Sequence, residues 1–377
     1  MDLTFLIRPD ILTMQAYKPI VPFDVLSKRL GRDPKDIIKL DANENPYGPS
    51  PKALAALAHL PDAHIYPDPE NTALRAALAK YTGLPMENLF AGSGSDELID
   101  LIMRLFLRPG DAILDCPPTF GMFAFDAAVN GAQVVEIPRR PDFSLDIDAI
   151  EVLFQSPISD LRPLTSHIPP PKLLFLASPN NPTGNVLPDD DLRRLLKLPV
   201  VVVLDEAYVE FHGANASRMP WVLEHDNLIV LRTFSKRAGL AGLRVGYGAF
   251  PLALMPHLWK IKQPYNVNVA ATAAAIAALE DLEYLDHVVA LLTAERDRLA
   301  EALSEIPSLR PFLSRANFVL ARVVGREAKE LQAALEREGI LVRHFNKPYV
   351  SDCLRISAGR PEHTSVLIAA LKRISEG

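Results

Sequence analysis

The chain has 377 residues, of which 49% are hydrophobic and 23% charged, and its formal net charge is −6. A chain of this length exceeds one ordinary domain and can bury about three quarters of its unfolded surface without disulfide or metal staples. The small negative charge gives no indication of a nucleic-acid surface. Cys116 and Cys353 are too few for a disulfide framework or a four-ligand zinc site, and their apolar surroundings are typical of reduced core cysteines.

The sequence predicts neither a signal peptide nor a membrane helix. The first apolar run is very short and is interrupted by Arg8 and Pro9. The Ala-rich stretch 267–279 is shorter than the roughly 18 residues that a spanning helix needs. We therefore expect a soluble, cytoplasmic protein without a membrane or nucleic-acid partner.

The first two thirds of the chain predict an arm followed by a large α/β domain. Residues 1–40 contain several prolines and are expected to form an N-terminal arm that runs over the surface to join the C-terminal unit. Between residues 41 and 265, apolar runs bounded by turn residues recur, and helical patterns such as 98–106 and 190–198 lie between some of them. Runs that are apolar throughout are typical of strands covered on both faces, so we expect a mostly parallel sheet between helices. The expected strands are 112–115, 133–137, 172–177, 200–204, 228–231 and 245–249.

After residue 265 the pattern changes to that of a smaller α+β domain, residues 266–377. An Ala-rich helix precedes a longer, charged amphipathic helix, and short strands then alternate with helices. The expected helices are 268–280, 283–304, 327–338 and 362–374, and the expected strands are 318–322, 340–343 and 353–356.

One lysine follows a strand in surroundings that suit an anion. The segment 233–244 has the sequence TFSKRAGLAGLR, which places Lys236 at the C-terminal end of a strand, where the ligand crevices of open α/β sheets form. Thr233, Ser235 and Arg244 supply hydroxyl and guanidinium donors for a group such as a phosphate. A partly desolvated lysine among such groups loses proton affinity, as an amine that attacks a carbonyl must. The alternative is an exposed lysine on a loop.

Asp205 ends the apolar strand VVVLD, where a carboxylate needs a cationic or hydrogen-bonding partner. A protonated pyridine nitrogen is such a partner, because the carboxylate keeps it protonated and lets the ring accept electrons. A magnesium ion, as on a Walker-B strand, would also require the loop G-x-x-x-x-G-K-[ST], which the chain lacks. We therefore predict no metal site.

Two loops add weaker signals. The segment AGSGSDE at 91–97 leads into a helix whose N-terminal amides can attract phosphate, although a capped helix would look the same. It has Glu97 where a dinucleotide-binding motif requires its third glycine, which argues against a dinucleotide site. The segment SPNNPTG at 178–184 holds Asn181 in a rigid loop after a strand, and an ordinary tight turn fits it equally well.

Together these motifs resemble those of the fold-type I enzymes that depend on pyridoxal phosphate, in the aminotransferase branch that includes histidinol-phosphate aminotransferase. The resemblance runs in order along nearly the whole chain. Its motifs are LDANENPYGPSP (40–51), YPDP (66–69), GSGSDE (92–97), CPPTFGMF (116–123), SPNNPTG (178–184), DEAYVEF (205–211), RTFSKRAGLAGLRVG (232–246) and CLRISAG (353–359).

The resemblance implies pyridoxal phosphate as the cofactor, with Lys236, Asp205 and Tyr208 as catalytic residues. Lys236 would form the Schiff base and move the substrate proton, and Asp205 would pair with the pyridine nitrogen. The other implied cofactor contacts are Asn181 and Tyr208 at the phenolate oxygen, Ser95, Asp96, Thr233, Ser235 and Arg244 at the phosphate, Phe120 stacked on the ring in the place of the family's usual tyrosine, and Tyr66 from the other subunit of a homodimer. The expected substrate contacts are Arg355, which would grip the substrate carboxylate, Arg343, Tyr17 and Asn45.

The implied reaction is a ping-pong transamination, with histidinol phosphate and 2-oxoglutarate as the leading substrate pair. The motif NENPYGPSP and the two arginines Arg343 and Arg355 are the features that favour this pair. An aromatic amino-acid aminotransferase of the same branch is the first alternative, and a decarboxylase of an amino-acid phosphate is the second. A regulatory protein that binds the cofactor is disfavoured, because such proteins are usually fused to a DNA-binding module and the chain has no basic extension.

Overall fold

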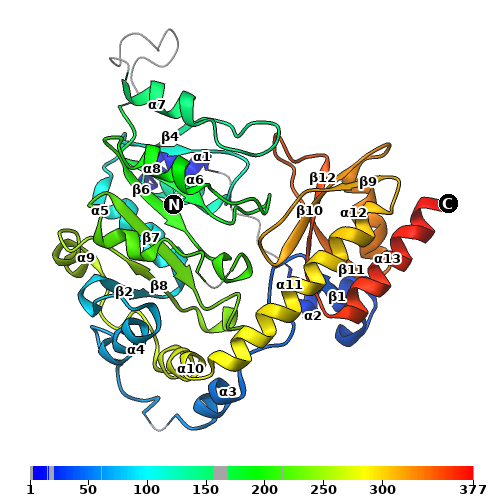
Figure 1. Ribbon diagram of the computed structural model, residues 1–377, viewed down its shortest axis with the longest axis horizontal. Helices are drawn as coiled ribbons and strands as arrows, with labels where there is room; N and C mark the ends of the chain where they lie inside the picture. Colours follow the sequence, from blue (N-terminus) through cyan, green and yellow to red (C-terminus); the bar gives the residue numbers. More distant parts are fainter. Residues whose placement is uncertain are drawn as a thin grey trace.

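The computed structural model describes residues 3–14, 16, 21–60, 62–155, 169–213 and 215–376. These residues form two bodies, each built around one sheet. The long helix α11 (Leu282–Ser304) runs from the larger body into the smaller one (Figure 1).

The larger body contains a seven-stranded sheet in the order β2-β8-β7-β6-β5-β3-β4. Strand β8 is antiparallel to both of its neighbours, and the other pairs are parallel. The predicted α/β fold with a mostly parallel sheet is therefore confirmed, and each of the six expected strands is present. The strands are β2 (Leu89–Gly92), β3 (Ala112–Asp115), β4 (Gln133–Glu136), β5 (Leu173–Ala177), β6 (Val201–Asp205), β7 (Leu228–Thr233) and β8 (Gly246–Ala249).

Helices cover both faces of this sheet, which explains why its central strands are apolar throughout. Along β5, Leu174 and Leu176 belong to one core, whereas Leu173 and Phe175 belong to the core on the opposite face. The face of Leu173 is covered by α5 (Gly94–Phe106), α6 (Met122–Val129) and α9 (Met255–Ile261). The other face is covered by α3 (Pro51–Ala58), α4 (Thr72–Thr82), α7 (Ile147–Gln155), α8 (Asp189–Leu195) and α10 (Val269–Leu279).

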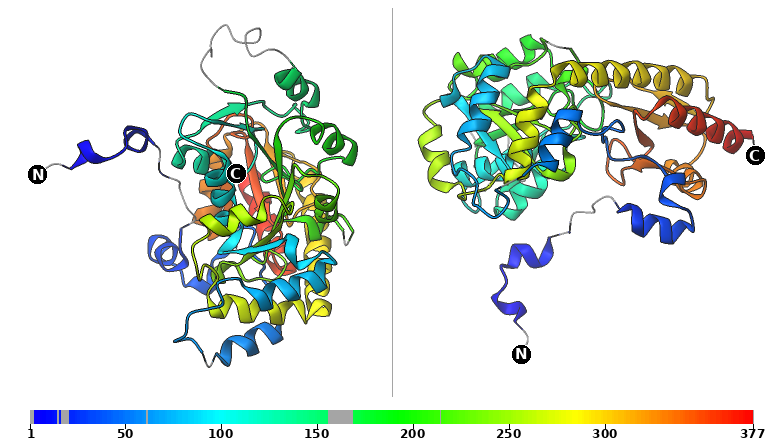
Figure 2. Two further views of the ribbon diagram at one scale, coloured as in Figure 1. Left: turned by 90° about the vertical axis from the view of Figure 1, so that its left-hand side faces the viewer. Right: turned by 90° about the horizontal axis from the view of Figure 1, so that it is seen from below.

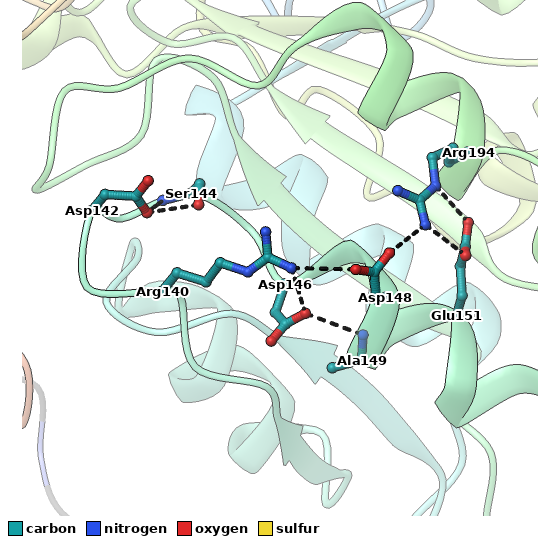
Figure 3. Close-up of polar contacts among 8 residues, drawn as sticks. All are labelled: Arg140, Asp142, Ser144, Asp146, Asp148, Ala149, Glu151 and Arg194. Carbon is teal, nitrogen blue, oxygen red and sulfur yellow. Dashed lines mark hydrogen bonds and ion pairs between the residues drawn. The ribbon is translucent and has the colours of Figure 1, made fainter.

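Ion pairs join α7 and α8 on the surface (Figure 3). Arg194 of α8 donates to Glu151 at 2.9 and 2.8 Å and to Asp148 at 2.6 Å, and both acceptors lie on α7. These pairs are open to solvent, which screens them, so they contribute little to folding. The apolar side chains beneath them, such as Ile150 and Leu195, hold the two helices to the sheet.

The smaller body contains a five-stranded sheet in the order β1-β11-β12-β10-β9. Strand β1 pairs in parallel with β11, so residues 38–40 join the C-terminal part of the chain in one sheet. Helix α2 (Phe23–Leu30) packs nearby, since Leu26 contacts Ile37 and Leu341. The strands are β1 (Ile38–Leu40), β9 (Leu309–Pro311), β10 (Phe318–Val323), β11 (Ile340–His344) and β12 (Cys353–Ser357), and the helices are α12 (Ala328–Arg337) and α13 (Pro361–Glu376).

Helix α10 lies on the larger body, although the boundary expected near residue 265 assigns it to the C-terminal domain. It packs against α3 and α4, and the alanines on its inner face, such as Ala271 and Ala275, are part of the core of the larger sheet. The short alanine side chains allow this close packing. We therefore propose that the large domain extends through α10 and that the division lies along α11.

One apolar cluster joins the two bodies. Tyr208 and Phe211 of the larger body pack with Phe318 of β10 and with Val288 and Leu292 of α11. Burying such side chains stabilises the contact by about 1.5–3 kcal/mol each. This cluster keeps the two bodies in a fixed relation next to Tyr208.

Residues 3–14 extend away from the two bodies (Figure 2). They contain a short helix, α1 (Pro9–Thr13), and exposed apolar side chains such as Phe5 and Leu6. The 3-10 helices of the chain are η1 (Thr4–Leu6), η2 (Pro34–Asp36), η3 (Met86–Asn88), η4 (Val209–Phe211), η5 (Met219–Leu223) and η6 (Ala241–Leu243). Within the described ranges, no helix is both long enough and apolar enough to cross a membrane.

Candidate functional site

A cavity of about 130 Å³ lies at the C-terminal edge of the larger sheet. Strands β2, β3, β5, β6 and β7 all point toward this edge, and the loops that follow them supply the cavity wall. The lining residues are Ser95, Asp96, Phe120, Ala177, Asn181, Asp205, Ala207, Tyr208, Thr233, Ser235, Lys236 and Arg244. Apart from the two alanines, all of them are predicted cofactor contacts. Of those predicted contacts, only Tyr66 is missing from the wall.

Asp205 is the buried acid of this cavity. One of its oxygens accepts a hydrogen bond from the amide of Ala207 at 2.9 Å, and its side chain is 5% exposed. The pKa of Asp205 is raised to about 7, mainly because the carboxyl group is buried; the charge of Asp96 also raises it, whereas the Ala207 amide and Lys236 oppose the rise. Among the described residues, no cation pairs with this carboxylate, although its buried position calls for one.

Lys236 follows β7 and faces the same space. Its ammonium lies 5.6 Å from the centre of the Tyr208 ring. The Tyr208 hydroxyl accepts a hydrogen bond from the side-chain amide of Asn43 at 3.0 Å, which leaves its own proton for a group in the cavity. Asn43 has φ of 55°, a left-handed conformation in which asparagine is enriched.

Hydroxyls, backbone amides and one guanidinium meet at the other end of the cavity. The Thr233 hydroxyl donates to Ser235 at 3.0 Å, and Ser95 lies in the first turn of α5. A Cβ on Gly246 would lie 2.5 Å from the amide nitrogen of Ser95, so a glycine is required for β8 to approach this helix. Arg244 has a left-handed φ of 53° and pairs with Asp96 at 2.6 Å. The positive helix N-terminus together with these donors suits a phosphate.

These groups fit pyridoxal phosphate. A buried carboxylate without a cation suits a protonated ring nitrogen, and the hydroxyl and amide donors suit a phosphate. Lys236 and the aromatic ring of Phe120 line the same cavity. No group of three or more metal-ligating side chains occurs in the described ranges.

A second, larger cavity of about 350 Å³ shares Phe120, Asn181, Tyr208 and Lys236 with the first. Residues of the smaller body, including Arg343 and Arg355, contribute to its wall, so it lies between the two bodies. Lys236 therefore faces both the predicted cofactor space and a space for a substrate.

Arg343 and Arg355 are direct cross-strand partners on β11 and β12. Arg355 is buried and donates to the Asn181 side-chain oxygen at 2.6 Å and to the backbone oxygen of Asp41 at 2.6 Å. The ring of Phe345 lies near both guanidiniums, 5.8 Å from Arg343 and 5.6 Å from Arg355. Two guanidiniums on one wall provide a strong anion site.

Two predicted contacts lie elsewhere. Tyr66 is 79% exposed and stacks on Tyr265 at a centroid distance of 4.7 Å, outside both cavities. Asn45 lines neither cavity, and its side-chain amide instead donates to the backbone oxygen of Arg237 at 3.0 Å. Asn43, two residues earlier in the same motif, lines the larger cavity. Tyr17 lies outside the described residues.

Sequence reasoning missed the residues that hold the Lys236 loop on the side away from the cavity. Arg237 points away from the cavity wall, donates to the Tyr81 hydroxyl at 2.7 Å and pairs with Asp286 near the start of α11. Asn45 fixes the backbone of Arg237 on the opposite side. An arginine next to the lysine was visible in the sequence, but its partners are distant in the chain.

Comparison with known proteins gives a consistent result. The family model for aminotransferase class I and II matches residues 35–371. The chain is 54% identical over 367 residues to the chloroplastic histidinol-phosphate aminotransferase of Nicotiana plumbaginifolia, covering 97% of this chain and 86% of that protein. It is 50% identical to the histidinol-phosphate aminotransferase of Roseiflexus castenholzii, covering 99% of each chain. The crystal structure of the Sinorhizobium meliloti histidinol-phosphate aminotransferase in complex with pyridoxal-5'-phosphate superposes with a TM-score of 0.86 at 29% identity, covering 98% of this chain and 97% of that one.

Replacing Asp205 by asparagine should stabilise the cofactor-free protein at neutral and higher pH. Because burial raises this pKa from 3.8 to about 7, the folded state holds the proton more tightly than the unfolded state. The resulting stabilisation is present below about pH 4 and is lost as the pH rises toward 7. The advantage of Asp205→Asn should therefore grow by about 2–3 kcal/mol between about pH 5 and about pH 8, measured by urea unfolding. A constant difference across this range would contradict the prediction.

Proposed function

Since the chain belongs to the aminotransferase class I and II family, we propose that it transfers the amino group of histidinol phosphate to 2-oxoglutarate. The products are imidazole acetol phosphate and L-glutamate, which places the reaction in histidine biosynthesis. The observation that carries the choice of substrate is the arginine pair Arg343 and Arg355, which lines the cavity that Lys236 also faces. The names of the relatives described above agree with it.

Pyridoxal phosphate is the cofactor, and when bound it supplies an electron sink for the charge that develops at the substrate carbon. We propose that Asp205 keeps the ring nitrogen protonated and that Ser95, Thr233, Ser235 and Arg244 hold the phosphate. Ring stacking on Phe120 needs no hydroxyl, so phenylalanine can serve at this position.

Lys236 has two proposed tasks, which its position between the cavities supports. It holds the cofactor covalently in the resting enzyme, and after the substrate amine displaces it, its free amine moves the proton at the substrate carbon. Tyr208 and Asn181 donate hydrogen bonds from the shared wall. The bond from Asn43 to Tyr208 keeps that hydroxyl in place, and the bond from Arg355 keeps Asn181 in place.

The arginine pair suits the two substrates in turn. A phosphate dianion can contact both guanidiniums, and the carboxylate next to the 2-oxo group can take the same position in the second half of the reaction. Arg355 is already held by Asn181 and Asp41, so it is preorganised for an anion. An aromatic amino acid has no distal anion and would use this pair only through its carboxylate.

We also propose that the protein is a homodimer in which Tyr66 reaches the phosphate in the partner's site. In its own chain Tyr66 is exposed and lines neither cavity, and the neighbouring Ile65 is exposed as well. The exposed apolar side chains of Phe5 and Leu6 provide further surface for a partner. A cytoplasmic location stays a prediction from the sequence.

Borohydride reduction should fix the cofactor on Lys236 alone. Reduction makes the covalent bond between the lysine amine and the cofactor permanent, so peptide mapping by mass spectrometry identifies the residue. Lys236→Ala should retain the fold by circular dichroism and should give no labelled peptide. A label on another lysine of the wild type would overturn the assignment.

Arg343→Ala should lower kcat/KM for histidinol phosphate by roughly 10- to 150-fold, which corresponds to a charge-assisted contact of about 1.5–3 kcal/mol. The loss for phenylalanine should be far smaller, because phenylalanine has no distal anion. Arg310→Ala is a suitable control, since Arg310 lies on β9 and bonds only backbone oxygens among the contacts described. Equal losses for both donors, or a wild type that prefers phenylalanine, would favour an aromatic aminotransferase.

Tyr66→Phe should weaken binding of the cofactor by about 0.5–1.5 kcal/mol, the net value of one hydrogen bond. A mixed dimer of Tyr66→Phe and Lys236→Ala subunits should contain one site with both native residues, because each site draws on both chains. Cofactor titration and activity of such mixtures provide the measurement. If the mixtures behave as the average of the two parent variants, Tyr66 acts within its own chain.

A further inference from the structure

A second lysine, Lys347, lines the larger cavity in addition to Lys236 and the arginine pair. Lys347 lies in the loop between β11 and β12 and is exposed, and its side chain reaches the larger body. Its ammonium nitrogen lies 3.2 Å from the position that a Cβ on Gly121 would occupy. Gly121 follows Phe120, so this cation lies next to the residue that is proposed to stack on the cofactor ring.

Lys347 and the arginine pair occupy different parts of the wall. Arg355 contacts Asn181 and Asp41, whereas Lys347 approaches Gly121 at the start of α6. Arg343 and Arg355 are held in a sheet, whereas Lys347 is on a loop. A lysine side chain is a compact charge on a flexible stem, so it can approach an anion and withdraw from a neutral group.

Two carboxyl groups lie at the same end of the cavity. Asp115 and Glu136 end the paired strands β3 and β4 and both belong to the cavity wall. Burial raises the pKa of Asp115 to about 7, so this group is only partly charged at neutral pH. Within the described part of the chain, no carboxylate oxygen lies within 4.0 Å of the Lys347 ammonium. Lys347 is therefore near these acids without an ion pair to either of them. Of the two, Glu136 is the main competitor of a substrate carboxylate for this lysine.

The two substrates place different groups at this end. In histidinol phosphate, the carbon that carries the amino group bears a phosphate arm and an imidazole arm. In glutamate and 2-oxoglutarate, the corresponding carbon bears a carboxylate and an arm that ends in a second carboxylate. If the arginine pair takes the phosphate or the first carboxylate, the remaining arm carries an imidazole in one half-reaction and an anion in the other.

We propose that Lys347 binds the distal carboxylate of the dicarboxylic amino acceptor and thereby determines acceptor specificity. This inference rests on the proposed function for the identity of the acceptor. In the donor half-reaction the flexible lysine withdraws and leaves room for the imidazole arm. The same cavity thus accommodates the imidazole arm of the donor and the carboxylate arm of the acceptor, because Lys347 can move.

The test uses Lys347→Met with the two half-reactions measured separately. Cofactor-free protein is loaded directly with pyridoxamine phosphate and mixed with 2-oxoglutarate, so the acceptor half-reaction needs no donor. Its kcat/KM should fall roughly 10- to 150-fold, as expected for a lost charge-assisted contact. With pyruvate, which has no distal carboxylate, the change should stay within about 2-fold. The half-reaction with histidinol phosphate should also stay within about 2-fold.

Matched variants separate this contact from a general effect of charge. Lys372→Met removes an exposed lysine on α13 and should change neither half-reaction. Lys347→Arg should retain most of the preference for 2-oxoglutarate over pyruvate. Glu136→Gln should raise kcat/KM for 2-oxoglutarate, because it removes the competing carboxylate.

A binding measurement gives a readout that does not depend on turnover. Glutarate is a dicarboxylate without a carbonyl, so it binds without reacting, and calorimetry on the protein loaded with pyridoxal phosphate should show its Kd rising at least about 10-fold in Lys347→Met. An equal loss for 2-oxoglutarate and pyruvate, or an unchanged Kd for glutarate, would overturn the proposal. A loss that appears with Arg343→Met but not with Lys347→Met would assign the distal carboxylate to the arginine pair. A wild type that does not use histidinol phosphate would overturn the proposed donor and leave the acceptor test intact.

Discussion

The site depends above all on the burial of Asp205 at the end of β6. A carboxylate in this position has one backbone amide as its partner in the protein, and burial raises its pKa to about 7. The loops that follow β2, β3, β5, β6 and β7 at one edge of the sheet enclose this acid. A cationic ring nitrogen removes the cost of this burial, so binding of the cofactor and stability of the large domain are coupled through one residue. The same burial makes the acid an effective partner, since solvent does not weaken the interaction.

The substrate space exists only where the two bodies meet. Arg355 belongs to the smaller sheet, yet it holds Asn181 of the larger body, and Asn43 holds Tyr208 in a similar way. The apolar contact of Tyr208 with Phe318 and Leu292 lies directly beside these bonds. A relative movement of the bodies would therefore disturb the donors that face the cofactor as well as the arginines that face the substrate. Any relative movement of the two bodies would therefore be coupled to the alignment of these groups.

The sequence predicted the parts that depend on local pattern. Six strands of the larger sheet and the helices of the C-terminal part follow from apolar periodicity, and the lining of the smaller cavity follows from loops placed after strands. Strands β1, β2 and β9 were missed: β1 and β9 have three residues each, and β2 runs directly into the segment that was interpreted as the loop before a helix. The sequence analysis predicted Asn45 as a substrate contact, whereas Asn43 lines the cavity. The motif does not reveal the left-handed φ of Asn43, which turns this residue inward. Partners such as Asp286 and Lys347 could not be found, because only the folded chain brings them to the site.

The loop that carries Lys236 is held on the side away from the cavity as well as on the cavity side. The neighbouring Arg237 pairs with Asp286 on α11 and donates to Tyr81 on α4. Helix α11 continues into the core of the smaller body, where its Leu299 and Leu303 pack beneath the sheet that carries the substrate arginines. The lysine proposed to hold the cofactor and the arginines proposed to hold the substrate are therefore both connected to one helix. Since a displacement of about 1 Å can cost two orders of magnitude in rate, a common rigid support for both groups is a direct route to reproducible geometry.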